Sequence, residues 1–414
     1  MSRILFYTSP AKGHLIPAMS TARELVRRGH SAHVRTLAGE LEGVRKSGAE
    51  ASAIDPRIEA RELDDWAAKT TMGALKRSMK TFGDRAYHEV DDLRAAIDGF
   101  APDVLVVDTN TWGAQAAAEA SGVPWAVFQP YFTPLPAPGV PPFGPGLAVM
   151  GGRVGRARDR ALGKVTIGSL TRLMLPSVNA VRAALGLPHV ESLEQALTRA
   201  PRVLYHTVPE LEYPRPEWPD SYRFVGPGSN DESPPWNAEV DRPVVLVTCS
   251  TERQSDRDLV DAALECLPPA GYFVVATTGA HDPADFDAPE GHAVVERSIP
   301  HSAVLRRAEV TICHGGMGIT QRSLASGVPV VVVPFGRDQL EVARRVEYAS
   351  VGVRLPSRHL KPPSLVDAVR KAADLTDNAR LMADHMAEYG GGQAGADVVE
   401  SLRLDAAPGA PPQS

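Results

Sequence analysis

Along residues 1–130, short unbroken runs of hydrophobic residues alternate with longer stretches in which hydrophobic residues recur every three or four positions. The unbroken runs predict strands and the periodic stretches predict helices. Strands are expected at 4–7, 32–36, 104–107 and 125–128, and helices at 17–26, 72–97 and 112–120. A further helix is expected later in the chain, at 167–185. Because each strand is separated from the next by a helix, this half is expected to form a parallel, doubly wound sheet.

The second half of the chain repeats this alternation. Strands are expected at 244–247, 272–276, 293–295, 310–313 and 328–333, and helices at 259–267, 317–326 and 340–348. The predicted fold class is therefore α/β, with two Rossmann-like, doubly wound parallel-sheet domains. Such sheets bind ligands beyond the carboxyl ends of their strands, at the point where strand order reverses. We expect the two domains to face a shared cleft that holds the main site.

The distribution of proline along the chain indicates the boundaries between these units. Residues 209–243 contain eight prolines, a density typical of extended chain rather than helix. We predict an N-terminal domain over 1–212, a proline-rich linker over 213–243, a C-terminal domain over 244–402 whose last helix packs back on the N-terminal domain, and a disordered tail over 403–414. Each domain is then of a size that can bury its own core.

Composition narrows the class of protein. The net charge of −6 and the scattered arginines give no reason to expect nucleic-acid binding. The three cysteines, Cys249, Cys266 and Cys313, lack metal-ligand spacing and are expected to be free thiols in a reducing compartment. No segment reaches the ~20 apolar residues needed to cross a bilayer, and the first residues do not resemble a secretory signal. We expect a cytoplasmic protein that inserts into no membrane.

A glycine-rich turn is the strongest chemical signal. It comprises His314, Gly315, Gly316, Met317 and Gly318, between a predicted strand and a predicted helix. Glycines let backbone amides approach a phosphate, and a helix N-terminus supplies positive potential there. The same residues also fit a tight turn capped by a histidine, so the turn alone leaves both interpretations open.

A second polar group follows the next strand. Asp338 and Gln339 come after the strand at 328–333, where the cleft is expected, and such a pair can hold sugar hydroxyls. Asp338 taken singly fits a helix N-cap better than a sugar ligand. Two Asp-x-Asp sequences, at 256–258 and 285–287, stand at a helix start and in a loop and are interpreted as solvated surface.

The order of these segments carries more information than any one of them. Ser298-Ile299-Pro300-His301, the His314 turn, Gly327-Val328-Pro329 and Asp338-Gln339 follow one another in an arrangement that resembles the donor-binding signature of glycosyltransferase family 1. These are nucleoside-diphosphate-sugar transferases of GT-B fold, and the bacterial branch acting on antibiotic and macrolide-type natural products is the most similar. The resemblance spans almost the whole chain and includes Gly13-His14-x-x-Pro17, Asp108 after a buried strand, and 248–251.

The resemblance implies roles for individual residues. His14 would be the general base that deprotonates the acceptor. Asp108 would orient the His14 imidazole and stabilise the charged form of that imidazole. The developing charge of the departing diphosphate would be stabilised by His314, by the amides of 315–318 and by Ser250 or Thr251, in place of a metal or cofactor. Further donor-binding candidates are Ser298, Ile299, Asp338 and Gln339, with Gly13, Thr320 and Arg322 completing the site.

Two positions depart from the family pattern. Arg322 stands where the resemblance places a glutamate that holds the ribose. Arg322 would instead face phosphate or simply lie on the solvent-exposed face of its helix. Ser298 stands where many relatives carry a tryptophan under the base, which shifts base recognition toward the backbone of Ile299.

The resemblance implies an inverting, metal-independent transferase that moves a sugar from a TDP- or UDP-sugar to a small hydrophobic natural product. The N-terminal domain would bind the acceptor, in a pocket formed by residues 66–185, and the C-terminal domain the donor. A monomer or a homodimer is expected. Alternatives are a nucleotide-sugar epimerase and a non-catalytic nucleotide-sugar-binding partner of the same fold. An oxidoreductase is disfavoured because no Gly-x-Gly-x-x-Gly follows the first strand.

Overall fold

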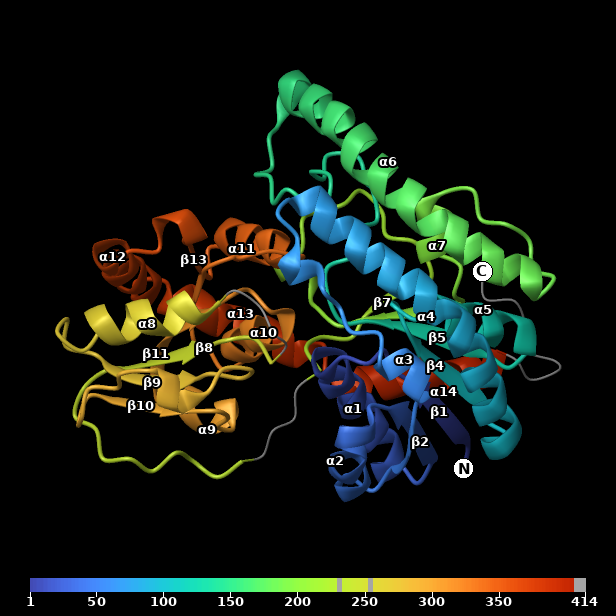
Figure 1. Cartoon of the computed structure of the whole chain (residues 1–414), viewed down its shortest axis with the longest axis horizontal. Coiled ribbons are helices and arrows are strands. Elements are labelled where there is room, and N and C mark those ends of the chain that lie inside the picture. Colours follow the sequence, from blue (N-terminus) through green and yellow to red (C-terminus); the bar gives the residue numbers. More distant parts are fainter. Residues whose placement is uncertain (229–232, 252–255, 406–414) are drawn as a thin grey trace.

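The computed structural model describes residues 1–228, 233–251 and 256–405, which form two α/β domains (Figure 1). Within the described residues the first sheet has the strand order β3-β2-β1-β4-β5-β6-β7 and all its pairings are parallel. Its strands are β1 (Arg3–Tyr7), β2 (Ser31–Thr36), β3 (Glu50–Ala53), β4 (Val104–Asp108), β5 (Trp125–Gln129), β6 (Arg202–Tyr205) and β7 (Tyr222–Phe224).

The second sheet is also parallel, with the order β10-β9-β8-β11-β12-β13. Its strands are β8 (Val244–Thr248), β9 (Phe273–Thr277), β10 (Ala293–Glu296), β11 (Ala308–Cys313), β12 (Val330–Val332) and β13 (Gly352–Arg354). The predicted fold class, two doubly wound parallel sheets, is confirmed. Strand order reverses between β1 and β4 in the first sheet and between β8 and β11 in the second, so each domain has one switch point.

Helices cover both faces of the two sheets. In the N-terminal domain they are α1 (Lys12–Arg27), α2 (Leu41–Lys46), α3 (Pro56–Glu59), α4 (Thr71–Phe100), α5 (Trp112–Ser121), α6 (Gly152–Ala184) and α7 (Leu193–Leu197). Those that follow β8 are α8 (Arg257–Cys266), α9 (His301–Leu305), α10 (Met317–Ala325), α11 (Gln339–Tyr348), α12 (Pro362–Ala373), α13 (Thr376–Glu388) and α14 (Gly392–Asp405). None of the helices described is long and apolar enough to cross a membrane.

The helix α1 begins five residues before the proline that was expected to start it. Pro17 lies inside the helix, where it removes one hydrogen bond, to the carbonyl of Gly13. Because Pro17 is the sixth residue of α1, beyond the first amides that any helix leaves unpaired, this hydrogen bond is lost from the regular part of the helix. The earlier start brings His14 into the first turn of α1, directly after β1.

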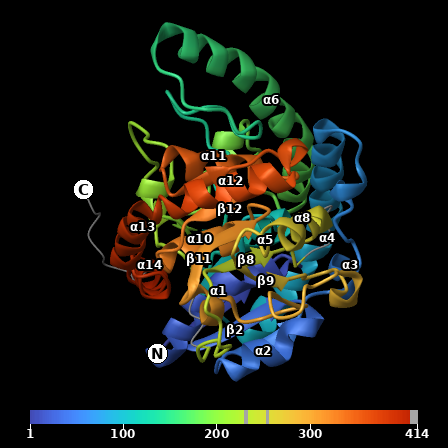
Figure 2. The ribbon, with the colours of Figure 1, turned by 90° about the vertical axis from the view of Figure 1, so that its left-hand side faces the viewer.

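The helix α6 is longer than the predicted span of 167–185 and projects from the top of the molecule (Figure 1 and Figure 2). Its first half is rich in arginine and lacks a broad apolar stripe, which is why periodicity alone missed it.

The proline-rich segment is not purely a linker. It contributes β7, the edge strand of the first sheet. Prolines are tolerated beside an edge strand because one side of it has no neighbouring strand to hydrogen-bond.

The last helix, α14, leaves the C-terminal domain and packs on α1. Ala396 and Val399 share a buried cluster with Ile4 and Leu25. The helix continues to Asp405, beyond the expected boundary at 402, and the rest of the predicted tail, 406–414, lies outside the described residues.

Candidate active site

The switch point of the N-terminal domain brings His14 and Asp108 together. His14 Nδ1 lies 2.9 Å from Asp108 Oδ2 and 3.1 Å from Oδ1. The Asp108 side chain is fully buried, whereas 17% of the His14 side chain is exposed. The imidazole therefore has one edge on a buried carboxylate and another toward the surface between the domains.

Asp108 is held as an ionised acceptor. Its carboxylate accepts hydrogen bonds from the amide and hydroxyl of Ser9, at 3.0 and 2.8 Å, and from the amide of Asn110 at 2.8 Å. Burial alone would raise the pKa of Asp108, but His14 and these donors outweigh it and lower the pKa below its usual value. Because an ionised carboxylate can only accept, the proton of a neutral His14 is placed on Nδ1, which leaves the lone pair on Nε2.

Tyr131, just after β5, closes one side of this pair. Its ring centroid lies 5.7 Å from that of His14, and its hydroxyl donates to Asn110 Oδ1 at 2.7 Å. Burial raises the pKa of Tyr131, and the charges of Asp108 and Asp338 raise it further. The tyrosine thus lies within the electrostatic reach of an aspartate from each domain.

The glycine-rich turn lies at the switch point of the C-terminal domain, between β11 and α10. Gly315 has a φ of +97°, which favours glycine, and a Cβ on Gly316 would stand 2.6 Å from His314 Nε2, so a side chain there would displace the imidazole. Gly318 is exposed and faces open space. Thr320 is instead buried, and its hydroxyl donates to the carbonyl of Gly316 at 2.9 Å. Thr320 therefore stabilises the turn, while Gly318 is open to solvent.

The loop after β8 is fixed by Asp256. This carboxylate accepts from the Ser250 amide at 2.6 Å, lies 3.1 Å from His281 Nε2, and lies 3.9 Å from His314 Nδ1. Asp256 is fully buried, so the prediction that 256–258 is solvated surface is wrong for this residue. The loop arrangement removes it from water, whereas Asp258 and the 285 and 287 positions are exposed.

Asp256 and His281 also belong to the one candidate metal cluster within the described parts of the chain. The ligand atoms of Cys249, Asp256 and His281 all lie within 4.8 Å of one another. The Cys249 thiol donates to the Asp256 carbonyl at 3.5 Å, and burial raises its pKa, which disfavours the thiolate that a metal needs. The cluster fits a hydrogen-bonded loop support better than a metal centre.

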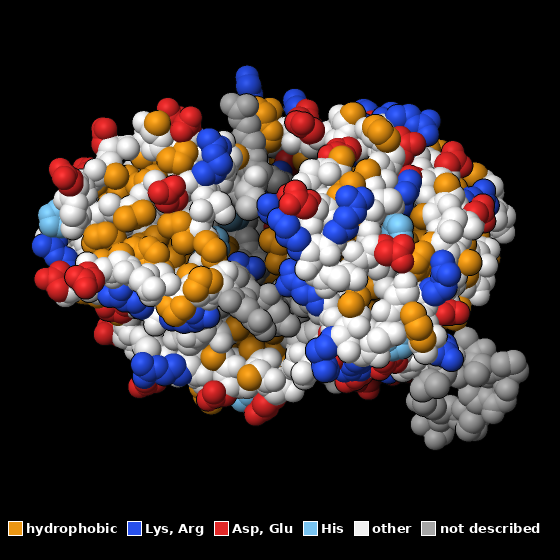
Figure 3. All heavy atoms as spheres, turned by 90° about the horizontal axis from the view of Figure 1, so that it is seen from below, with side chains coloured by type: hydrophobic (Ala, Val, Ile, Leu, Met, Phe, Trp, Pro, Cys, Tyr) orange, Lys and Arg blue, Asp and Glu red, His pale blue; other side chains and the backbone are white. Residues whose placement is uncertain are grey.

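Asp338 lies at the N-terminus of α11, opposite His14. It is the N-cap residue by position, but its side chain makes no capping hydrogen bond. Burial raises the pKa of Asp338, while Arg337 and His14 act to lower it, so the imidazole and this carboxylate are electrostatically coupled across the two domains. Figure 3 shows the surface hollowed between the two lobes of the molecule.

The neighbours of Asp338 have structural partners. Gln339 is buried, and its side-chain oxygen accepts from the amides of Phe335 and Gly336 at 2.8 and 2.9 Å. Arg337 has a φ of +53°, and its Nε and Nη2 donate to the two carboxylate oxygens of Asp65, each at 2.9 Å. This bidentate ion pair joins the loop before α11 to the N-terminal domain, a link between distant segments that sequence reasoning missed.

The remaining candidates surround these centres. Ser298 is exposed and Ile299 half-buried after β10, Thr251 is exposed at the end of the described part of the loop after β8, and Arg322 is half-buried on α10. Gly13 is exposed in the first turn of α1 with open space around it. The structure thus distributes the candidates along the carboxyl ends of both sheets.

Comparisons with known proteins show the family and the fold of the chain. Residues 272–402 match the family model described as erythromycin biosynthesis protein CIII-like, C-terminal domain. The chain is 33% identical to 4'-demethylrebeccamycin synthase of Lentzea aerocolonigenes over 90% of this chain and 92% of that protein. Among solved structures, the calicheamicin glycosyltransferase CalG4 is similar with a TM-score of 0.75 and 21% identity over 99% of this chain and 100% of that one.

A second solved structure, the Streptomyces sp. SF2575 glycosyltransferase SsfS6 complexed with thymidine diphosphate, has a TM-score of 0.65 and 21% identity, covering 98% of this chain and 100% of that one. The fold and the facing switch points define a two-domain glycosyltransferase of the GT-B class. The chain belongs to glycosyltransferase family 1, in its bacterial branch that acts on natural products.

Proposed function

We propose that the protein catalyses inverting transfer of a sugar from a TDP- or UDP-sugar to a nucleophile on a small hydrophobic natural product, with His14 as the general base. The observation that carries the proposal is the contact of 2.9 Å between His14 Nδ1 and the buried Asp108 carboxylate, with Asp338 coupled to the same imidazole from the other domain. A base and a candidate sugar-binding carboxylate then share one cleft.

In the proposed step, His14 Nε2 takes the proton of the acceptor group as that group attacks the anomeric carbon. The bond from this carbon to the diphosphate oxygen breaks, and its electron pair leaves with the nucleoside diphosphate. Attack from the face opposite the leaving group inverts the anomeric centre. Asp108 stabilises the imidazolium that forms, as a buried carboxylate does for a catalytic histidine.

On the donor side, the exposed backbone of Gly318, the N-terminus of α10 and His314 are proposed to bind the diphosphate. Asp338 is proposed to accept hydrogen bonds from sugar hydroxyls, since its side chain caps no helix. Gln339 holds its own loop with its oxygen, and Thr320 holds the turn, so both are assigned supporting positions.

We further propose that the reaction needs neither a metal nor a cofactor, with the donors above neutralising the leaving group. Thymidine is the favoured base, because the similar SsfS6 structure holds thymidine diphosphate. The unpaired state of Cys249, Cys266 and Cys313 supports a cytoplasmic location. Monomer and homodimer both remain compatible with the proposal.

The test is to incubate the protein with TDP- and UDP-sugars and a panel of polycyclic aromatic and polyketide acceptors, with and without EDTA. Mass spectrometry is expected to detect an acceptor enlarged by one sugar, equally in both conditions, and NMR of the product to give the inverted anomeric configuration. Release of nucleotide without a sugar adduct would favour the epimerase alternative or simple hydrolysis, and inhibition by EDTA would contradict metal independence.

A further inference from the structure

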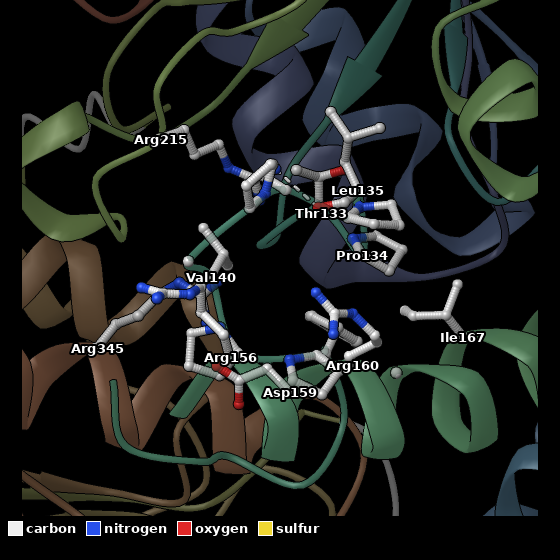
Figure 4. A pocket seen from close by; sticks show the side chains of 18 residues that line it. Thr133, Pro134, Leu135, Val140, Arg156, Asp159, Arg160, Ile167, Arg215 and Arg345 are labelled. Atoms are coloured by element: carbon white, nitrogen blue, oxygen red, sulfur yellow. Dashed lines mark hydrogen bonds between the residues drawn. The ribbon is translucent and has the colours of Figure 1, made fainter. Parts of the chain in front are cut away.

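A second cavity lies beside the interface, between the chain after β5 and the first half of α6. It has a volume of about 320 Å³. Loop residues 133–143 form one wall, and Arg156, Arg160, Gly163 and Ile167 of α6 form the other (Figure 4). Cavities of this size hold small organic molecules in proteins. None of the candidate catalytic or donor-binding residues lines it.

The charge of this cavity is one-sided. Four arginines and a single carboxylate, Asp159, line it. Asp159 is already paired with Arg158 at 2.7 Å, and Arg158 does not line the cavity. Arg156 and Arg160 form no ion pair with any residue that the structure describes. The helix side of the cavity therefore presents positive charge without a protein counter-charge.

Arg215 adds a third cation at the inner side. Its Nη1 donates to the carbonyl of Leu135 at 2.7 Å and its guanidinium stacks on Trp218 at 4.3 Å. Its Nε is buried and has no hydrogen-bond partner among the described residues, and burial lowers the pKa of this guanidinium. A buried donor without an acceptor is costly, and an acceptor from a ligand would offset that cost. The fourth arginine, Arg345, is already paired with two glutamates.

The rest of the lining is mostly apolar, and one end of it lies near the candidate active site in the chain. Leu135, Val140 and Phe143 stand among prolines on the loop wall. The cavity begins at Thr133, two residues along the chain from Tyr131, whose ring lies beside His14. Two residues span at most about 7 Å, which is within the length of a molecule of a few fused rings.

We propose that this cavity binds the acidic end of the acceptor, and that the acceptor is an organic carboxylate with a flat apolar body. Arg156 and Arg160 hold the carboxylate, Arg215 adds positive charge at the inner side of the cavity, and the proline-lined wall packs against the body. The proposal rests on the proposed function for the identity of the ligand as acceptor, but the binding of an organic anion does not depend on any transfer reaction.

The first experiment measures binding alone by calorimetry, using 2-naphthoate and its methyl ester as probes without a sugar donor. The carboxylate is expected to bind at least tenfold more tightly than the ester. The double variant Arg156→Gln/Arg160→Gln should remove most of this preference, whereas Arg153→Gln, an exposed arginine on the same helix that does not line the cavity, should keep it. Equal binding of acid and ester to the unmodified protein overturns the proposal, and so does competition by inorganic phosphate as strong as that by naphthoate.

A steric variant tests the location without changing charge. A Cβ on Gly163 would already contact Pro142 at 3.8 Å, so the longer side chain of Gly163→Met must extend into the cavity that both residues line. The matched control is Gly168→Met on the same helix, where a Cβ meets nothing within 4 Å. Loss of naphthoate binding in the first variant alone supports the proposal, and equal binding in both overturns it.

The last arm tests the substrate class with 6-hydroxy-2-naphthoate and its methyl ester as acceptors. The acid is expected to have a KM at least tenfold lower, and Arg156→Gln/Arg160→Gln should raise that KM with kcat nearly unchanged. A preference for the ester overturns the assignment of the acceptor. If naphthoate binds as expected but no acceptor is glycosylated, the proposed transferase reaction fails while the anion site stands.

Discussion

His14 combines two features at the residue scale that a surface histidine lacks. It is fixed by a buried carboxylate through Nδ1, and it stands in the first turn of a helix that starts directly after a central strand. Both features set the direction of the ring and leave Nε2 as the basic atom, so the base is oriented before a substrate arrives.

Replacement of His14 is therefore expected to stop transfer and spare donor binding. His14→Ala should lower kcat by roughly 10²–10⁴, the usual range for loss of a general base. The affinity for TDP, measured by calorimetry, should stay within about twofold, because the glycine-rich turn belongs to the other domain. His359→Ala, an exposed histidine in the C-terminal domain, is the control. Turnover equal to that of the unmodified protein would remove His14 from the mechanism.

His206 governs a different property, the stability of the fold in acid. It is fully buried, neither ring nitrogen has a partner among the described residues, and burial lowers its pKa from 6.5 to about 4. The folded protein thus binds this proton more weakly than the unfolded chain does. Stability is complete above the unfolded pKa and is lost as the pH falls from about 6.5 to about 4.

The variant His206→Leu should flatten this part of the pH profile. A shift of this size corresponds to about 3 kcal/mol of unfolding free energy at pH 4. Urea unfolding at pH 7 and pH 4.5 measures the difference, and the unmodified protein is expected to lose more stability between these values than the variant. An identical loss in both proteins would show that other groups account for the acid sensitivity.

A residue could be assigned to the candidate site from the sequence only where its position relative to a predicted strand was enough to locate it. Asp108 ends a strand, and His14, His314 and Asp338 come after strands, so the parallel sheets bring them to the carboxyl edges. The Asp65–Arg337 pair could not be predicted, because it joins segments that only tertiary packing brings together. Asp256 was misread for a related reason, since a carboxylate at a helix start is normally solvated and its burial depends on the loops around it.

At the scale of elements, the sequence predicted the central strands well because their runs are unbroken and fully buried, as in β4 and β8. The strands β3, β6, β7 and β13 were not predicted. Three of them, β3, β7 and β13, are short and stand at sheet edges, where one-sided pairing leaves little hydrophobic pattern. The fourth, β6, lies inside the sheet, but it has only four residues and begins with Arg202. The proline density that favoured a linker was correct about extended chain but could not indicate that part of it joins the sheet.

The close contact between α5 and α4 depends on a glycine. A Cβ on Gly113 would stand 1.8 Å from the carbonyl oxygen of Ala86 in α4, so only glycine allows the two helices to approach this closely. Gly113→Ala must push α5 away from α4, and Asp108 lies just before α5 in the chain.

This variant is expected to lower the unfolding free energy by about 3 kcal/mol, at the upper end of the range for overpacking. The matched control is Gly99→Ala near the end of α4, where a Cβ meets nothing within 4 Å and alanine should be neutral or stabilising by up to ~1 kcal/mol. Thermal unfolding followed by circular dichroism compares the two. A melting temperature unchanged in Gly113→Ala would mean that the helices separate without cost.

At the scale of the whole molecule, transfer needs the two domains held in one relative position. Arg345 of α11 pairs with Glu212 at 2.5 Å and Glu341 at 2.8 Å, and all three side chains are at most 2% exposed. Glu341 in turn accepts from the amides of Gly144 and Gly146, both at 2.8 Å. Residues of the N-terminal domain and of α11 thus share one buried network beside the cleft.

Removal of the central cation should affect stability and transfer but not donor binding. Arg345→Met leaves two buried carboxylates without their cation, which typically costs about 3–5 kcal/mol of unfolding free energy. Because His14 and Asp338 lie on opposite domains, a looser interface should also lower kcat, whereas the glycine-rich turn that is proposed to bind TDP lies within one domain and should keep its affinity. Lys371→Met, which breaks an exposed pair with Asp367, should change stability by less than about 0.5 kcal/mol. Urea unfolding, steady-state kinetics and TDP titration of both variants separate these effects. If Arg345→Met weakened TDP binding as much as it lowered turnover, the network would be supporting the donor domain itself rather than the relative position of the two domains.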